Sequence, residues 1–246
     1  MKIYTGKFYG VSLEGFPDGL TEAIYAVNAE SNFFASDNLF TFSKNLSLLS
    51  DSEFMAAFEA NIATDNEHSI IWRTYVLAWA ARHAVNLEGD FVECGCYKGT
   101  TAKIICDLVD FKKQNRKYYL YDLFDHEPDM LHPKMPEHSK ELYPKTKERF
   151  QDYPNVLVTQ GKVPDILHEV APDKIAMMHI DLNNAEAEIG ALDILFDRMV
   201  PGAVLVLDDY GWNPFLETKI AEDKWLGERG YFVLELPTGQ GLVFKR

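Results

Sequence analysis

The sequence is short of cysteine, of basic charge and of long apolar runs. Its three cysteines, Cys94, Cys96 and Cys106, are an odd number in one short stretch, which argues against a disulfide framework and offers no second ligand pair for zinc. Lys and Arg number 24 against 38 Asp and Glu, and the net charge of −14 has the wrong sign for neutralising phosphates. We therefore expect reduced thiols and neither nucleic acid nor an anionic membrane as partner.

Segments that would carry the chain into or across a membrane are also missing. No apolar run approaches the roughly 20 residues that span a bilayer, and the first ten residues contain no apolar stretch typical of an export signal. These absences predict a cytoplasmic location. The 246 residues are 47% hydrophobic and 13% aromatic, so the chain can bury a large core.

The hydrophobic pattern changes at about residue 88. Before it, Ser50-Asp51-Ser52-Glu53 has the form of a capping box that begins a helix, and a second helix is predicted over about 68–85. The segment before residue 45 is aromatic but aperiodic, which is typical of a cover over a site or of a dimer contact. We assign residues 1–66 to this N-terminal helical cover. Its rings include Phe33, Phe34, Phe40 and Phe42.

After residue 88, short apolar runs alternate with helical patterns. This rhythm predicts an α/β protein with a doubly wound, Rossmann-like sheet that is mostly parallel. Only residues 237–240 separate the last two runs, so we expect an antiparallel hairpin at the C-terminal end. We assign this domain to residues 67–246. The predicted strands cover residues 91–94, 117–124, 155–160, 175–182, 203–209, 231–236 and 241–246.

The first predicted strand ends in a glycine turn, where a fold of this class binds its ligands. Gly95 and Gly99 permit a tight turn, and the helix that follows presents unpaired N–H groups to an anion such as a carboxylate. The denser G-x-G-x-x-G pattern of dinucleotide sites is absent. Glu93, two residues before the first glycine, suits a ligand with a cationic group. The alternative is an ordinary turn between a strand and a helix.

Asp122 lies at the end of the second predicted strand. Its distance from the glycine turn is that of an acceptor for two ribose hydroxyls, so turn and acid together favour a nucleoside site. The alternative is that Asp122 only caps the next turn, which is a common role of aspartate.

These motifs resemble the S-adenosylmethionine site of class I methyltransferases. A wider set at residues 89–95, 161–167, 199–203 and 208–211 resembles the macrocin O-methyltransferase family, which includes the mycinamicin and novobiocin sugar O-methyltransferases. The similarity covers roughly residues 37–246. It implies methionine contacts from the glycine turn, a ribose contact from Asp122 and adenine contacts after the third strand. The implied cofactor residues are Glu93, Cys94, Gly95, Tyr97, Gly99, Thr100, Thr101, Asp122, Gln160, Gly161 and Lys162.

Three aspartates follow the fourth and fifth predicted strands. Asp181 ends one strand and Asp208-Asp209 the other, so their carboxylates can meet at one edge of the sheet. Carboxylates so close repel each other unless a proton or a cation intervenes, and Mg²⁺ prefers oxygen ligands. A turn after a buried strand is the alternative for Asp208 and Asp209. The resemblance also implies that all three bind a metal, although Asn183 stands where the family has a second acid.

Together these features predict a Mg²⁺-assisted, S-adenosylmethionine-dependent O-methyltransferase. We expect Asp181 to be the general base as well as a metal ligand, and the deeper His179, a rival base, to be a core residue. The acceptor is expected to be a small-molecule hydroxyl, of a sugar in a glycoside or polysaccharide or of a natural product. The resemblance is consistent with a homodimer. Alternatives are a non-catalytic S-adenosylmethionine-binding protein of the same fold and, less favoured, a nicotinamide-dependent oxidoreductase.

The long connection at 125–143 is the expected substrate lid. It contains His126, His132 and His138 between a strand and a helix, and connections of this length often close over a site. One of these histidines is a further candidate for assisting deprotonation, while a solvated loop is the alternative.

Overall fold

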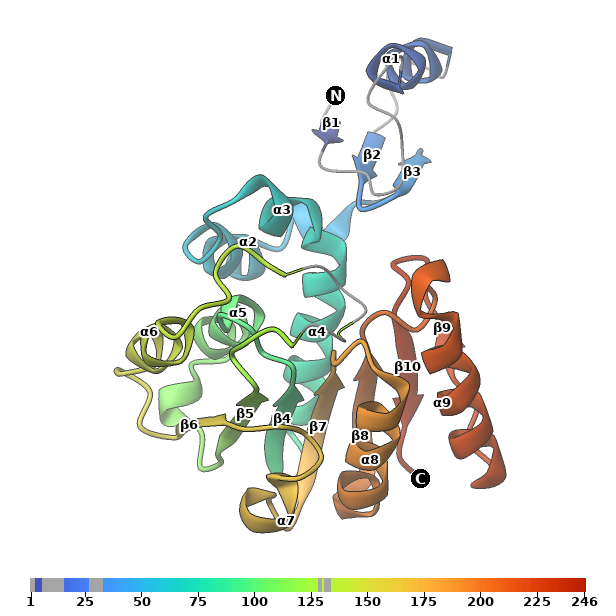
Figure 1. Cartoon of the computed structure of the whole chain (residues 1–246). Coiled ribbons are helices and arrows are strands. Elements are labelled where there is room, and N and C mark those ends of the chain that lie inside the picture. Colours follow the sequence, from blue (N-terminus) through green and yellow to red (C-terminus); the bar gives the residue numbers. More distant parts are fainter. Residues whose placement is uncertain (1–2, 6–15, 27–32, 128–129, 131–133) are drawn as a thin grey trace. The chain divides into compact units, whose positions relative to one another are not determined.

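The computed structural model describes residues 3–5, 16–26, 33–127, 130 and 134–246, and the chain divides into two compact units, 1–75 and 76–246. Figure 1 shows the elements of both. The boundary that we predicted from the sequence, between residues 66 and 67, falls inside helix α3 (Asp65–Ser69). Among the described residues, no helix is both long and apolar enough to cross a membrane.

The first unit contains a small sheet that the sequence did not predict. Strand β1 (Ile3–Thr5) pairs in parallel with β2 (Phe33–Ser36), and β2 pairs antiparallel with β3 (Leu39–Phe42). The β2–β3 turn is Asp37-Asn38, and both residues have positive φ, as a two-residue hairpin turn requires. Helices α1 (Phe16–Ala26), α2 (Ser52–Glu59), α3 and the beginning of α4 (Ile71–Ala84) complete the unit.

The second unit is built on a seven-stranded sheet in the order β6-β5-β4-β7-β8-β10-β9. Neighbouring strands from β6 to β8 are parallel, and β10 is antiparallel to both β8 and β9. The predicted fold class, including the antiparallel C-terminal hairpin, is therefore confirmed. The strands are β4 (Asp90–Cys94), β5 (Tyr118–Asp122), β6 (Val156–Gln160), β7 (Ile175–Ile180), β8 (Met199–Leu207), β9 (Leu234–Glu235) and β10 (Gly241–Phe244).

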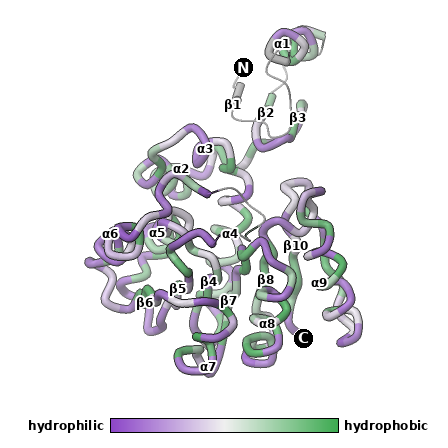
Figure 2. The backbone as a smooth tube through the Cα atoms, in the orientation of Figure 1, coloured by the Kyte–Doolittle hydropathy of each residue, from purple (hydrophilic) through white to green (hydrophobic). Residues whose placement is uncertain are grey.

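Alternate residues of the sheet enter two apolar cores, one on each face. Phe91 and Met177 pack with residues 77–84 of α4 and with α5 (Thr100–Leu108), whereas Val92 and Met178 pack with α8 (Ala185–Leu195). This alternation follows from the period of two along a strand. Figure 2 shows hydrophobic residues along β8 and β10. The remaining helices are α6 (Leu142–Arg149), α7 (Leu167–Val170) and α9 (Leu216–Glu228), with short 3-10 turns at Ser47–Leu49, Phe111–Lys113, Phe196–Arg198 and Asn213–Phe215.

Candidate active site

The register of the sheet brings the predicted site residues together at the carboxyl ends of the strands. Glu93 on β4 lies beside His179 on β7. One step further along, the Asp181 N–H donates to the Cys94 carbonyl over 2.8 Å and the Asp208 N–H donates to the Ile180 carbonyl over 3.0 Å. Asp181 and Asp208 are thus neighbours, each two residues beyond the level of His179.

A buried polar network runs beneath this edge. The Tyr118 hydroxyl donates to Glu93 Oε2 over 3.0 Å, and His179 Nδ1 lies 3.3 Å from Glu93 Oε1. On its other side, His179 Nε2 lies 3.5 Å from Asp208 Oδ1, to which Gln240 Nε2 donates over 2.9 Å. The imidazole therefore stands between two carboxylates from different strands, and His179 is the core residue that its depth predicted, only 3% exposed.

Charge crowding shifts the pKa values of the network. Burial alone would lower the pKa of His179, but the Asp208 and Glu93 carboxylates outweigh it and hold that pKa well above its ordinary value. Burial, with the nearby charges of Asp208 and Asp209, raises the pKa of Asp181 well above its ordinary value. Both shifts have the direction expected where several carboxylates lie close together.

Neighbouring segments of the chain lie close to the glycine turn. Gly95 has φ of +92°, and a Cβ there would lie 1.8 Å from the Asp181 carbonyl oxygen. Gly99 has φ of +70°, and its Cβ would lie 2.6 Å from the Phe150 ring. Thr100 and Thr101 form the first turn of α5 directly after Gly99. The two glycines are required because neighbouring chain segments occupy the space of a side chain.

Asp122 organises the turn from the end of β5. Its Oδ2 accepts the Tyr97 N–H and its Oδ1 accepts the Phe124 N–H, both over 2.6 Å. Tyr97 and Phe124 both have positive φ, so this carboxylate holds two strained loop residues. The predicted capping role is therefore present, and the carboxylate also lies at the turn where a ribose acceptor is expected.

The third strand ends beside Asp122. The Gly161 N–H donates to the Asp122 carbonyl over 2.9 Å, and Gln160 Nε2 donates to the Leu123 carbonyl over 3.1 Å. Lys162 extends outward to Glu127, with 3.1 Å between Nζ and Oε2. All three predicted adenine contacts thus lie at the same edge as the glycine turn.

The cysteines near the turn are not activated thiols. Cys94 and Cys96 are buried, and burial raises the pKa of each thiol, with the charges of Glu93 and Asp122 adding to the effect. Reaction through a cysteine thiolate is therefore disfavoured at this edge.

Part of the 125–143 connection lies against the glycine turn. The Tyr97 hydroxyl pairs with the Glu137 carboxylate, and Lys98 Nζ lies 3.1 Å from Glu137 Oε1. His138 packs edge-on against the Tyr97 ring and lies 5.8 Å from the His126 ring, measured between centroids. His132 lies outside the described residues. The described end of the predicted lid thus contacts a predicted cofactor residue.

Two further buried carboxyl groups, those of Glu188 and Glu222, were not predicted from the sequence. Glu188 on α8 accepts the Leu182 N–H over 3.2 Å, which fixes the loop after Asp181. Glu222 on α9 is fully buried, and no described residue gives either of its oxygens a hydrogen bond in good geometry. Burial and the charge of Glu188 raise the pKa of Glu222 to about 10. Glu188 and Glu222 lie on different helices, so no local sequence pattern could have predicted that they influence each other.

Replacing Glu222 by glutamine is expected to stabilise the protein at neutral pH, by an amount that grows as the pH rises. Folding raises the pKa of Glu222 from 4.5 to about 10, so above pH 4.5 the unfolded chain releases a proton that the native state keeps. Stability is therefore lost as pH rises from 4.5 towards 10, at about 1.4 kcal/mol per pH unit. Glutamine has no proton to release, so this decrease of stability with pH should not occur in the variant.

Urea unfolding between pH 5 and pH 9 measures this effect. The exposed Glu228, near the end of the same helix, provides the control, since Glu228→Gln should leave the pH dependence of the parent unchanged. An equal decline of stability with pH in Glu222→Gln and in the parent would contradict the assigned pKa.

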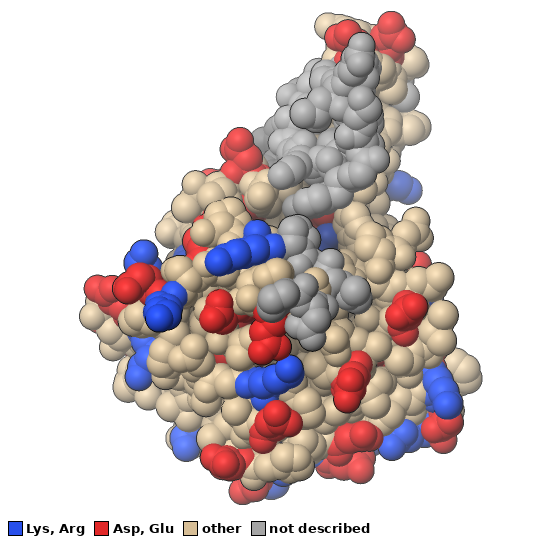
Figure 3. Space-filling model, viewed as in Figure 1, with Lys and Arg blue, Asp and Glu red and all other residues tan. Residues whose placement is uncertain are grey.

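A divalent cation and a cationic nucleoside both fit this edge. Among the described residues, His179, Asp181 and Asp208 each offer one ligand atom, all within 4.8 Å of one another, and Asp209 is outside that group. The charge of Asp209 is nevertheless close enough to contribute to the raised pKa of Asp181. Figure 3 shows acidic side chains scattered over the molecular face in view.

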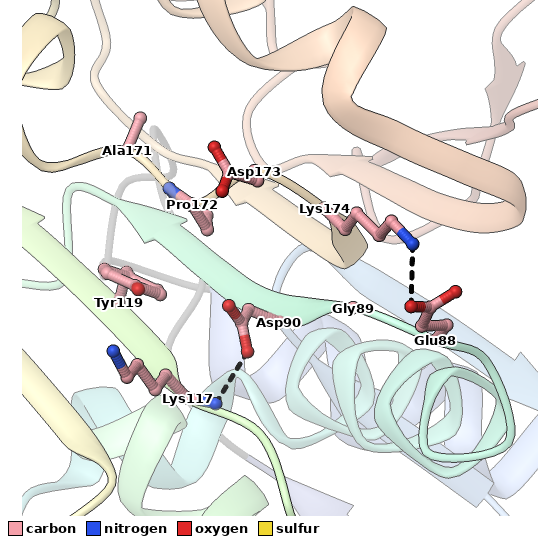
Figure 4. A pocket seen from close by; sticks show the side chains of 9 residues that line it. All are labelled: Glu88, Gly89, Asp90, Lys117, Tyr119, Ala171, Pro172, Asp173 and Lys174. Atoms are coloured by element: carbon pink, nitrogen blue, oxygen red, sulfur yellow. Dashed lines mark hydrogen bonds and ion pairs between the residues drawn. The ribbon is translucent and has the colours of Figure 1, made fainter.

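A cavity of about 480 Å³ lies at the opposite end of the sheet, beside the residues where β4, β5 and β7 begin. Figure 4 shows Lys174 paired with Glu88, 2.7 Å apart, and the Lys117 N–H donating to Asp90 over 2.7 Å. Three acidic and two basic side chains line this cavity, and none of the predicted site residues lies there.

Comparisons with known proteins agree with the fold. Residues 92–210, from β4 to just beyond β8, match a family model described as a methyltransferase domain. The chain is similar to the solved O-methyltransferase NovP, with 19% identity, a TM-score of 0.59, and coverage of 71% of this chain and 80% of that one. A search of the curated proteins finds no match.

Two further solved structures extend the similarity. CalS11, a TDP-rhamnose 3'-O-methyltransferase of calicheamicin biosynthesis in its apo form, is 16% identical with a TM-score of 0.58, covering 80% of this chain and 90% of that one. The SAH-bound methyltransferase PaMTH1 of Podospora anserina is 12% identical with a TM-score of 0.51, covering 98% of this chain and all of that one. At such identities these similarities establish the shared fold.

Proposed function

We propose that the chain is an S-adenosylmethionine-dependent O-methyltransferase that acts on a hydroxyl group of a small molecule. The observation that carries the proposal is the excess of carboxylates at the carboxyl ends of β4, β5, β7 and β8, contributed by Glu93, Asp122, Asp181 and Asp208. S-adenosylmethionine carries a sulfonium and an ammonium group, which such an edge attracts, whereas the pyrophosphate of a nicotinamide cofactor would be repelled. The methyltransferase-domain match over 92–210 supports this choice.

In this proposal the glycine turn holds the methionine part of the cofactor. The backbone of residues 93–101 lies against it, and the first turn of α5 offers N–H groups to its carboxylate. Asp122 binds the ribose while it keeps Tyr97 in place. Residues 160–162 border the adenine.

S-adenosylmethionine, when bound, supplies an electrophilic methyl group, and a divalent cation supplies positive charge that stabilises an alkoxide. The chain itself has to hold a hydroxyl oxygen in line with that methyl group and to accept its proton. Asp181 is the proposed acceptor, since it follows the carboxyl end of β7 beside Asp208 and its side chain is only half-buried. Asn183 Nδ2 donates to Asp181 Oδ1 over 3.2 Å and orients the carboxylate.

A sugar hydroxyl is the acceptor class that we propose. CalS11 is a TDP-rhamnose 3'-O-methyltransferase, and NovP is an O-methyltransferase, and both share this fold. A homodimer and a cytoplasmic location remain predictions from the sequence.

The proposal is tested by S-adenosylhomocysteine release with a panel of nucleotide sugars and glycosides, followed by mass spectrometry of the acceptor. We expect turnover with at least one hydroxylated acceptor and none with its deoxy analogue. Methyl transfer to an amine, a thiol or a carbon atom would contradict O-methylation. Cofactor binding without turnover on any member of a broad panel would favour the non-catalytic alternative.

A further inference from the structure

We infer that Glu137, in the connection between β5 and α6, is a positioning residue of the cofactor site. It holds the strained Tyr97 in the glycine turn and thereby keeps the Asp122 carboxylate oriented for the ribose. This inference rests on the proposed function, because it adds a residue to the same cofactor site. No role for Glu137 was predicted from the sequence.

Tyr97 has a backbone conformation that residues with a side chain rarely adopt. Its φ is +48°, in the left-handed region. Residues in such conformations persist where the surrounding contacts fix them, and they are common at ligand sites. In this conformation the Tyr97 N–H donates to Asp122 Oδ2 over 2.6 Å. Contacts that fix Tyr97 therefore also fix the carboxylate that is proposed to bind the ribose.

Glu137 binds Tyr97 through both its backbone and its side chain. The Glu137 N–H donates to the Tyr97 hydroxyl over 3.1 Å, and the same hydroxyl donates to the Glu137 carboxylate. The other carboxylate oxygen lies 3.1 Å from Lys98 Nζ. One residue of the connection thus contacts two consecutive side chains of the glycine turn.

The chain around Glu137 forms a turn that packs on Tyr97. The His138 N–H donates to the Met135 carbonyl over 3.1 Å, and the Met135 N–H donates to His138 Nδ1 over 3.2 Å. The His138 ring lies edge-on to the Tyr97 ring, with 5.1 Å between the centroids. An internally hydrogen-bonded turn therefore holds Glu137 in place beside the glycine turn.

The charge of Glu137 strengthens these contacts. The Tyr97 hydroxyl, and after it Lys98, lowers the pKa of Glu137 although partial burial opposes them. Hydrogen bonds to a charged group contribute more than those between neutral groups. The alternative support for Tyr97 is Thr146 Oγ1, which donates to the Tyr97 carbonyl over 3.3 Å. If that support suffices, Glu137 fastens the connection and has no effect on the cofactor.

Calorimetric titration with S-adenosylhomocysteine tests the inference by a double-mutant cycle. We expect Glu137→Ala and Tyr97→Phe each to weaken binding about tenfold, and the double variant also about tenfold, because all three lose the same interaction. Glu137→Gln keeps an oxygen that accepts the Tyr97 O–H and should bind within about threefold of the wild type. Glu148→Ala, which removes an exposed acid from α6, should bind as the wild type does.

Amide hydrogen exchange of the unliganded protein, followed by NMR, measures the contact with Asp122 directly. The Tyr97 amide should exchange at least about tenfold faster in Glu137→Ala than in the wild type, while the urea midpoint of unfolding stays unchanged. A residue with a merely structural role would lower the midpoint and leave cofactor affinity as it is.

Three results would overturn the inference: unchanged exchange of the Tyr97 amide in Glu137→Ala, affinity of that variant equal to the wild type, or a double variant weakened about a hundredfold, as two independent residues would give. An equal loss of affinity in Glu137→Gln and Glu137→Ala would also exclude the link through the Tyr97 hydroxyl. Wild-type protein separates the two proposals. If it binds no S-adenosylhomocysteine, the proposed function fails and the inference with it, whereas normal wild-type binding with an unaffected Glu137→Ala overturns the inference alone.

Discussion

Replacing Gly95 by alanine is expected to lower the free energy of unfolding by about 4 kcal/mol or more. The new Cβ would lie 1.8 Å from the carbonyl oxygen of Asp181, and Gly95 has φ of +92°, where side chains are strained. The obstructing atom belongs to the backbone at the end of β7, so no rotation of a side chain can relieve the contact. Either the glycine turn or the strand end has to move.

Chemical unfolding of Gly95→Ala and of a matched glycine variant measures this effect. Gly227 lies in α9, and a Cβ there would have no neighbour within 4 Å. Gly227→Ala should therefore leave stability unchanged or raise it by up to about 1 kcal/mol, as expected for alanine in a helix. Equal stability of Gly95→Ala and the parent would show that the turn does not approach Asp181 so closely.

Replacing Asp181 by asparagine is expected to reduce methyl transfer about a thousandfold while cofactor affinity stays within about threefold. Asparagine keeps the shape of the side chain but cannot accept a proton, and it is a weaker ligand for a cation. The cofactor contacts proposed here are made by the glycine turn, Asp122 and residues 160–162, and Asp181 is only one of four carboxylates that attract the cofactor, so its loss should weaken cofactor binding only slightly. Turnover and cofactor binding should therefore respond separately.

The same substitution should not destabilise the metal-free protein. Folding raises the pKa of Asp181, so at neutral pH its ionisation beside Asp208 and Asp209 costs stability, and asparagine removes that cost. Loss of turnover with unchanged or increased stability is the behaviour of a functional residue. Asp152→Asn, at an exposed position remote in sequence, is the control for both assays. Full turnover in Asp181→Asn would remove this residue from the mechanism.

The sequence predicted the main sheet well because its signals are local. Apolar runs of the right length marked β4 to β8, and the four-residue separation of the last two runs identified the hairpin. The small sheet of the first unit was missed, since β2 is buried at every position and shows no alternation. Its two-residue Asp37-Asn38 turn was the available signal.

Contacts between distant strands limited what the sequence could say about the site. Strand-end placement correctly brought Asp181 and Asp208 into one row. The link from Glu93 through His179 to Asp208 depends on register across three strands, and Gln240 joins it from the far hairpin. Such pairings are set by tertiary packing, and no local pattern in the chain encodes them.

The central claim is that the acidic edge of the sheet binds S-adenosylmethionine, and calorimetric titration tests it most directly. Chelator-treated protein should bind S-adenosylmethionine with micromolar affinity and give no binding heat with NADH, because the carboxylates attract the sulfonium ligand and repel the pyrophosphate. Binding of NADH in preference to S-adenosylmethionine, or the absence of S-adenosylmethionine binding, would contradict the proposed function. Only the shared fold would then remain supported.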